Sequence, residues 1–189
     1  MLTGMLELDG SVGEGGGQVL RVAVALSAIM AKPLSIFNIR KKRSNPGLRP
    51  QHIAAVRSVA EVCGAEVHGL SIGSTEIVFK PGPIKGGDLR LDTGTAGSTT
   101  LVLQSLLPVL AYAGKPSSYQ IIGGTNNPMA PPVEYLQHVL NPILKPMGLK
   151  WSVELVRRGF YPKGGGIIRG NVNPVQSLKP ISLTGRPEV

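Results

Sequence analysis

The chain has 189 residues, of which 42% are hydrophobic and 16% are charged, and its formal net charge is +9 at pH 7. This composition excludes a disordered tail and suits a compact body with a sizeable core, while the surplus of positive charge favours phosphate-bearing partners. The single cysteine, Cys63, excludes an intrachain disulfide and a cysteine-based zinc site. Because no apolar run reaches membrane-spanning length and Met1–Gly10 lacks a secretory signal pattern, we expect a cytoplasmic protein without a membrane partner.

The first half of the chain alternates apolar periodic segments with turns that carry glycine and proline. In chain order, the expected strand, helix, strand, helix, strand and strand span residues 5–9, 18–30, 34–39, 51–63, 65–69 and 75–80. Gly64 follows the second helix directly, at a position where glycine commonly ends helices.

The second half repeats this order of elements. The expected strand, helix, strand, helix, strand and strand span residues 89–92, 97–113, 119–122, 133–147, 149–156 and 165–172. Leu8-Asp9 matches Leu91-Asp92, and Lys32-Pro33 matches Lys115-Pro116, in each case 83 residues later. The shared order and these identities together predict an internal duplication.

We therefore predict an α/β (α+β) fold made of tandem βαβαββ units, each a four-stranded sheet with two helices on one face. The first unit would span residues 1–83 and the second residues 84–173. Residues 174–189 would begin a third unit, or an inserted domain, that this chain cuts short. Without a third sheet, an apolar face of the second unit would stay exposed, so we also expect self-association into a homo-oligomer.

A glycine-rich segment, residues 10–17, connects the first expected strand to the first helix. Glycines let the backbone approach a ligand closely, and the N–H groups at a helix start attract anions. Arg21 lies one turn into this helix, where it can reach back to a phosphate. Glu14 would repel a phosphate unless it holds a metal or positions a donor. The alternative is a glycine-rich turn in which Glu14 only complements the helix dipole.

A basic loop follows the second strand and carries five cations: Arg40, Lys41, Lys42, Arg43 and Arg49. Such a loop can cradle an RNA backbone or a terminal phosphate, and arginine suits bidentate phosphate binding better than lysine does. The alternative is a solvated basic loop. His52 starts the next helix and is open to a catalytic role, but we expect a partly buried structural histidine there. His68 and His138 have no partner pattern and are expected to be structural or exposed.

The second unit carries a counterpart of each loop and one further segment. Residues 92–98 open its first helix, in which Gln104 lies 83 residues after Arg21. A neutral amide suits a base, a sugar or another substrate edge, although an ordinary exposed glutamine is the alternative. Residues 123–132 repeat the position of the basic loop without its charge, and their prolines can simply start the next helix. Residues 158–168 form an aromatic and glycine-rich corner, which is either a structural bend or a loop that approaches phosphate.

Together these segments resemble the RNA 3'-terminal phosphate cyclase family, and the resemblance covers almost all of residues 5–175. The stretch Arg-Gly-x-x-Pro-x-Gly-Gly-Gly-x-Ile at 158–168 matches the signature of that family in full. Further matches to the family's motifs lie at residues 8–21, 45–52, 97–104 and 123–132.

The resemblance implies βαβαββ units similar to the C-terminal domain of a bacterial translation initiation factor. It also implies an ATP-dependent, ligase-type nucleotidyl transferase that converts an RNA 3'-phosphate into a 2',3'-cyclic phosphate. In that reaction a histidine accepts AMP from ATP with the help of a divalent metal (Mg or Mn), and AMP then passes to the RNA 3'-phosphate. The vicinal 2'-hydroxyl finally attacks the activated phosphorus and expels AMP. The implied partners are ATP and an RNA with a 3'-terminal phosphate.

The resemblance assigns roles to seven residues of this sequence, with Glu14 at the metal, Arg21, Arg40, Arg43 and Gln51 at the phosphate or RNA, and Gln104 and Pro131 at ATP. The AMP-accepting histidine of the family matches none of His52, His68 and His138. That nucleophile is therefore expected beyond Val189, and no catalytic residue is assigned within this chain.

Two other functions are open at this stage. One is a non-catalytic relative that binds RNA during ribosome assembly, a class that the same family contains. The other is a transferase built from the same units, such as an enolpyruvyl transferase, but such enzymes lack the stretch at 158–168. Glu14 and the arginines favour the cyclase, because a scaffold does not need a carboxylate at a metal.

Overall fold

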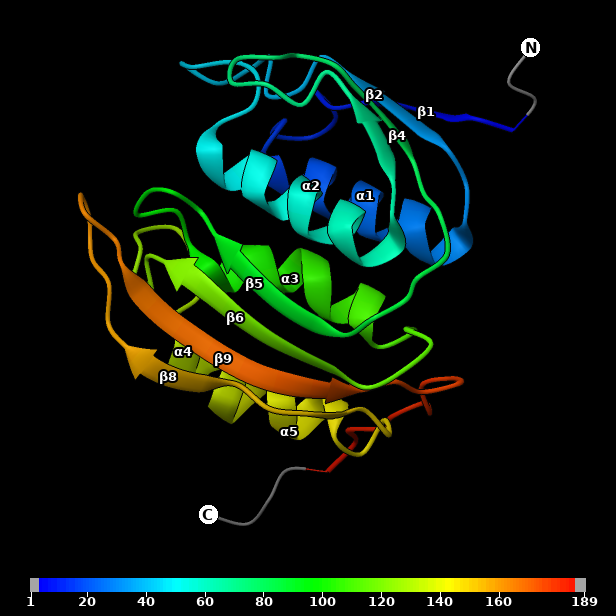
Figure 1. Ribbon diagram of the computed structural model, residues 1–189, viewed down its shortest axis with the longest axis vertical. Helices are drawn as coiled ribbons and strands as arrows, with labels where there is room; N and C mark the ends of the chain where they lie inside the picture. Colours follow the sequence, from blue (N-terminus) through cyan, green and yellow to red (C-terminus); the bar gives the residue numbers. More distant parts are fainter. Residues whose placement is uncertain (1–3, 186–189) are drawn as a thin grey trace.

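The chain folds into two β-sheets with helices packed against them (Figure 1). The structure, a computed structural model, describes residues 4–185. In chain order the elements are β1 (Leu6–Asp9), α1 (Gly17–Met30), β2 (Leu34–Phe37), α2 (Pro50–Cys63), β3 (Glu66–His68), β4 (Ile77–Lys80), β5 (Asp88–Asp92), α3 (Thr99–Leu110), β6 (Ser117–Gly123), α4 (Val133–Tyr135), the π-helical η1 (Leu136–Leu140), α5 (Asn141–Leu144), β7 (Lys150–Trp151), β8 (Glu154–Arg157) and β9 (Gly166–Asn173).

The two sheets begin with the same pairing pattern. In the first sheet the order is β1-β2-β4-β3, with β1 and β2 parallel and the other pairs antiparallel. In the second the order is β5-β6-β9-β7, with β5 and β6 parallel and β8 paired to β9. A crossover helix, α1 or α3, joins each parallel pair, as parallel pairing requires. The mixed α/β class is therefore confirmed, whereas the unit boundaries and the duplication stay predictions. The second sheet has five strands and not the expected four, because β7 and β8 pair separately with β9.

Helices α1, α2 and α3 pack together where the two halves of the chain meet (Figure 1). Helix α3 contacts both α1 and α2, and it also covers β6 and β9 of its own sheet. The buried apolar side chains of both halves form one cluster, which includes Val59 of α2, Leu106 of α3 and Ile121 of β6. Burial of this shared surface stabilises the halves against each other. It therefore also fixes the position of the loops at the helix ends.

Local sequence signals set the ends of these helices. Helix α2 begins at Pro50, whose missing N–H is not needed at the first helical position, and ends before Gly64, which adopts a left-handed φ of 58°. Helix α3 begins after Ser98, whose hydroxyl accepts a hydrogen bond from the Leu101 N–H at 3.3 Å. The glycine signal at the end of α2 thus acts as expected, whereas the cap at Ser98 was not foreseen.

Two expected elements are interrupted in the structure. The helix expected at 133–147 divides into α4, η1 and α5 and ends at Leu144. Pro142 has no N–H to donate to the preceding turn, so a π-helical segment comes before it. The strand expected at 149–156 divides into β7 and β8, and a register shift between Leu155 and Arg157 bends β8 along β9.

Rows of apolar side chains on two helices are exposed. On α1 the row consists of Val22, Leu26 and Met30, and along α4, η1 and α5 it consists of Tyr135, Val139 and Ile143. Such a row occurs in both halves of the chain, so the expected exposed apolar face of the second unit stays a prediction. Self-association through these rows stays a prediction.

Within residues 4–185, no helix is both long and apolar enough to cross a bilayer. Cys63 is a free, buried thiol. A cytoplasmic location stays a prediction.

Gly159 lies at the base of the corner formed by residues 158–168, directly against another backbone. A side chain at this position would overlap the amide nitrogen of Gly166 and the carbonyl oxygen of Gly123. Thr125 holds the contact in place, because its N–H donates to the Gly159 carbonyl at 2.9 Å and its hydroxyl accepts from the Gly159 N–H at 3.0 Å. Gly159, Gly164 and Gly166 therefore serve close packing of three chain segments.

We expect Gly159→Ala to lower the free energy of unfolding by about 2 kcal/mol or more, because the touching backbones must separate. Gly114→Ala is the matched control, since a Cβ there would lie 3.6 Å from its nearest neighbour, the Ile84 carbonyl oxygen. Urea unfolding of both variants measures the difference. Equal stabilities would contradict the close packing at Gly159.

Candidate functional site

A groove of about 840 Å³ opens at the N-terminal end of α1. The glycine-rich segment forms one wall, and side chains of the basic loop and of the first turn of α2 form the other. Leu101 of α3 and Met129, which belong to the second half of the chain, also line the groove. The groove therefore brings together segments that are far apart in the sequence.

The glycine-rich segment passes closest to its neighbours at Gly16 and Gly17. A side chain at Gly17 would collide with the imidazole of His52, and one at Gly16 would come within 3.2 Å of an Arg43 guanidinium nitrogen. Gly16 also precedes α1 without providing a side-chain cap. The N–H groups of the first turn of α1 therefore have no capping side chain, and such groups attract anions.

Arg21 places a buried positive charge beside this helix start. The residue is only 8% exposed, and its Nε has no hydrogen-bond partner within residues 4–185. Burial lowers the pKa of the guanidinium from its usual value, which shows the cost of removing this charge from water. An anion in the groove would offset that cost.

The basic loop folds over the glycine-rich segment. An Arg43 guanidinium nitrogen lies 3.3 Å from a carboxylate oxygen of Glu14, and the Lys42 ammonium donates to the Gly13 carbonyl at 3.1 Å. The Glu14 side chain is 92% exposed, so this ion pair contributes little to stability. Both partners are therefore available to a ligand at low cost.

Arg40 has a partly structural role in the groove. Its guanidinium donates to the carbonyl oxygens of Asn45 and Gly47 at 2.6 and 2.8 Å, and so it organises the loop that carries Arg43. Burial, followed by the nearby charges of Arg49 and Arg43, lowers its pKa. Arg40 lines the groove with its positive charge, while these two hydrogen bonds of its guanidinium stay within the basic loop.

His52 is buried and lines the groove, and its Nδ1 accepts a hydrogen bond from the Arg49 N–H at 3.1 Å. Burial is the main cause that lowers its pKa to about 4, and the charges of Arg40, Arg21 and Arg49 add to this effect. At neutral pH the imidazole is therefore uncharged and carries its proton on Nε2. In this tautomer His52 presents an N–H donor beside Gly17 and no lone pair for nucleophilic attack. The expected structural role fits, but its place in the groove was not foreseen.

The seven residues assigned by the resemblance fall into two places. Glu14, Arg21, Arg40, Arg43 and Gln51 line the groove, whereas Gln104 and Pro131 line a separate hollow of about 110 Å³ between α3 and the helical segment that begins with α4. The hollow and the groove are neighbours along α3, because Thr100 lines the hollow and Leu101 lines the groove.

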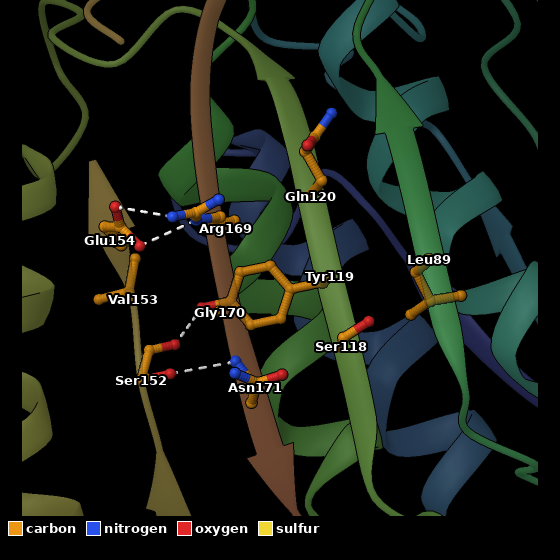
Figure 2. A pocket seen from close by; sticks show the side chains of 10 residues that line it. All are labelled: Leu89, Ser118, Tyr119, Gln120, Ser152, Val153, Glu154, Arg169, Gly170 and Asn171. Carbon is orange, nitrogen blue, oxygen red and sulfur yellow. Dashed lines mark hydrogen bonds and ion pairs between the residues drawn. The ribbon is translucent and has the colours of Figure 1, made fainter. Parts of the chain in front are cut away.

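A larger hollow of about 350 Å³ lies on the second sheet (Figure 2). The Tyr119 hydroxyl in this hollow donates to the Ser152 carbonyl at 2.7 Å, and Arg169 forms two hydrogen bonds with Glu154 at 2.8 and 3.1 Å. Because the two charged side chains of this hollow pair with each other, it is a weaker candidate than the groove.

Metal-binding side chains do not cluster in the described part of the chain. Within residues 4–185, no group of three or more histidine, cysteine, aspartate or glutamate side chains is arranged to hold a metal ion. A magnesium ion that shares a single carboxylate with substrate phosphates needs no such cluster. Glu14, exposed at the mouth of a cationic groove, suits that mode of binding.

The neutral state of His52 gives a direct test of this site. We expect long-range proton–nitrogen NMR to show an Nε2–H tautomer that gains its second proton only near pH 4, below the ordinary pKa of 6.5. Unfolding lets the imidazole bind a proton at its ordinary pKa, so stability falls as the pH drops from 6.5 toward 4, by up to about 3 kcal/mol.

The matched variant is His52→Gln, which identifies the His52 signal by its disappearance and should flatten the loss of stability between pH 6.5 and 4. Protonation of His52 near pH 6.5 would contradict the burial of this side chain among the arginines.

Known proteins resemble this chain over nearly its whole length. A family model described as RNA 3'-terminal phosphate cyclase matches residues 12–184. Proteins named RNA 3'-terminal phosphate cyclase from Desulfurococcus amylolyticus and Ignicoccus hospitalis are 50% and 54% identical to the chain over 98% of its length. The chain spans about half the length of these relatives, namely 52% of each. A solved structure of EPSP synthase from Acinetobacter baumannii is 13% identical, with a TM-score of 0.41 over 95% of this chain and 50% of that one. The chain therefore belongs to the RNA 3'-terminal phosphate cyclase family.

Proposed function

We propose that this chain supplies the phosphate-binding part of an ATP-dependent RNA 3'-phosphate cyclase, which converts an RNA 3'-phosphate into a 2',3'-cyclic phosphate. The observation that carries this proposal is the buried guanidinium of Arg21. It lies beside a helix start without a capping side chain, and its Nε has no partner within residues 4–185. A terminal phosphate monoester supplies the negative charge and the acceptor oxygens that these groups lack.

Three groups would share the terminal phosphate in this proposal. Arg21 would bind it from the buried side of the groove, and Arg43 from the exposed side. His52 would donate its Nε2–H, and as a neutral group it would add no further charge to a site that already holds several arginines. Arg40 would act through the loop, by holding Arg43 in place through its bonds to Asn45 and Gly47.

We propose that Glu14 would hold a magnesium or manganese ion together with phosphate oxygens of ATP. A carboxylate alone would repel the phosphate oxygens of ATP. A divalent cation between them neutralises the negative charge and so removes this repulsion. Arg43, which now pairs with Glu14, would be released toward the phosphate when the carboxylate turns to the cation. Gln104 and Pro131 would contact the nucleotide from the neighbouring hollow.

The reaction implied by the family has three steps, in each of which a new bond to phosphorus forms and an old one breaks. A histidine nitrogen attacks the α-phosphorus of ATP and expels pyrophosphate, the RNA 3'-phosphate then takes the AMP from that nitrogen, and the 2'-hydroxyl finally displaces AMP. We propose that the nucleophile is not among the histidines of this chain. In support, His52 presents an N–H to the groove, His68 contacts Glu66 on β3, and His138 is exposed on η1.

We expect Arg43→Ala to weaken binding of a short RNA with a 3'-phosphate by about 10- to 100-fold, the cost of one charge-assisted contact. Binding of the same RNA with a 3'-hydroxyl should weaken much less, since the contact is made to the phosphate. Fluorescence anisotropy with the 189-residue chain measures both affinities.

The matched control for this variant is Arg90→Ala, which removes an equally positive side chain from the exposed face of β5. If Arg43→Ala weakens both RNAs equally, Arg43 contacts only the general backbone, and the assignment to the terminal phosphate is wrong.

We expect Glu14→Gln to abolish most of the tightening of ATP binding that magnesium produces, because glutamine keeps the shape but lacks the charge that a hard cation needs. ATP binding without magnesium should be unchanged or slightly tighter, since a like charge has been removed. Titration of a fluorescent ATP analogue with and without magnesium measures the effect.

Glu7→Gln on β1 serves as the control, because it removes an exposed carboxylate away from the groove. An unchanged magnesium effect in Glu14→Gln would favour the alternative in which Glu14 only complements the start of α1.

A further inference from the structure

We propose that a cleft beside Tyr161 binds the base of the nucleotide that carries the terminal phosphate. This inference rests on the proposed function, because it assumes that the phosphate occupies the groove at the start of α1. The cleft measures about 360 Å³, within the range of small-ligand sites, and adjoins that groove. Gln51 lines both, so a nucleotide with its phosphate in the groove has its base within reach of the cleft.

The cleft presents flat, mostly apolar surfaces. Tyr161, Pro162 and Pro50 line it together with Ala96 and Gly97, and none of its eight lining residues is acidic. Arg49 adds a guanidinium at its edge. An unpaired nucleobase has the complementary properties, since it stacks on aromatic rings and guanidinium planes and is attached to an anionic backbone.

The aromatic side chains at this corner are unusually exposed. Tyr161 is 81% exposed and Phe160 is 56% exposed. Aromatic rings are normally at least partly buried, so an exposed pair on a protein surface indicates a binding surface. The ring of Tyr161 borders the cleft, whereas Phe160 is not among the residues that line it.

The corner is also held in place by its neighbours, so little conformational entropy is lost when a ligand binds to it. The Gly164 N–H donates to the Phe160 carbonyl at 2.7 Å and closes the turn. A side chain at Gly164 would collide with the backbone at Thr95 and Ala96, so the tip of the corner rests directly on the loop that forms the opposite wall of the cleft. Arg157 braces the base of the corner through a 2.9 Å bond to the Gly165 carbonyl.

The test compares short single-stranded RNAs that end in a 3'-phosphate and carry either a normal or an abasic 3'-terminal nucleotide. We expect Tyr161→Ala to weaken binding of the normal RNA at least about fivefold and to leave binding of the abasic RNA unchanged. Tyr161→Phe should bind like the unchanged chain, because stacking needs the ring and not the hydroxyl. Tyr112→Ala, which removes a partly exposed tyrosine after α3, is the control and should have no effect.

Three results would overturn the proposal: a loss below twofold in Tyr161→Ala, an equal loss with the abasic RNA, or a loss in Tyr161→Phe as large as in Tyr161→Ala. The preference for a 3'-phosphate over a 3'-hydroxyl tests the proposed function separately, since Tyr161→Ala should weaken both RNAs by the same factor and leave this preference intact. Weaker binding by Tyr161→Ala with an intact preference for the 3'-phosphate would support both the base cleft and the phosphate site. The same weakening in a chain that does not prefer the 3'-phosphate would contradict the phosphate site alone. A chain that binds neither RNA would overturn both.

Discussion

The close contact between the backbone of Gly17 and the imidazole of His52 determines the shape of the groove. No side chain larger than hydrogen fits between them, so the start of α1 lies directly against the first turn of α2. The same contact leaves a guanidinium nitrogen of Arg21 3.2 Å from the position that a Gly17 side chain would occupy. A helix start, a buried cation and a neutral donor thereby face one small volume, and each of these groups favours an anion.

Charge balance around His52 makes this arrangement possible. The imidazole is surrounded by Arg40, Arg21 and Arg49, and a proton on it would add a fourth positive charge to a buried region. Burial and these neighbours keep it neutral, and the hydrogen bond from the Arg49 N–H leaves the remaining proton on Nε2. A histidine that the sequence predicts to be structural and partly buried thus lines the groove as a neutral group, without adding to the electrostatic repulsion.

The packing of α3 against α1 and α2 links the groove to the second half of the chain. Leu101 reaches the groove from α3, and Gln104 opens onto the neighbouring hollow one turn later. The corner at 158–168 approaches from the far side, where Gly164 rests on the backbone at Thr95 and Ala96. Gly159, Gly164 and Gly166 of this corner are therefore needed for close packing, while its exposed aromatic side chains are free to meet a ligand.

The sequence by itself determined the element order, because apolar periodicity and turn residues act locally. It also identified the loops that carry Glu14 and Arg43 and the helix that carries Arg21. It missed the interruption of the helix after Val133 and of the strand after Leu149, since these depend on how Pro142 and the β8–β9 pairing are accommodated. Only the tertiary structure decided that Arg40 is used within its own loop, that His52 is neutral and lines the groove, and that Gln104 and Pro131 lie in a separate hollow. The physical reason is that hydrogen-bond partners, burial and the field of distant charges depend on segments brought together in space, whereas helix and strand signals depend on neighbours in the chain.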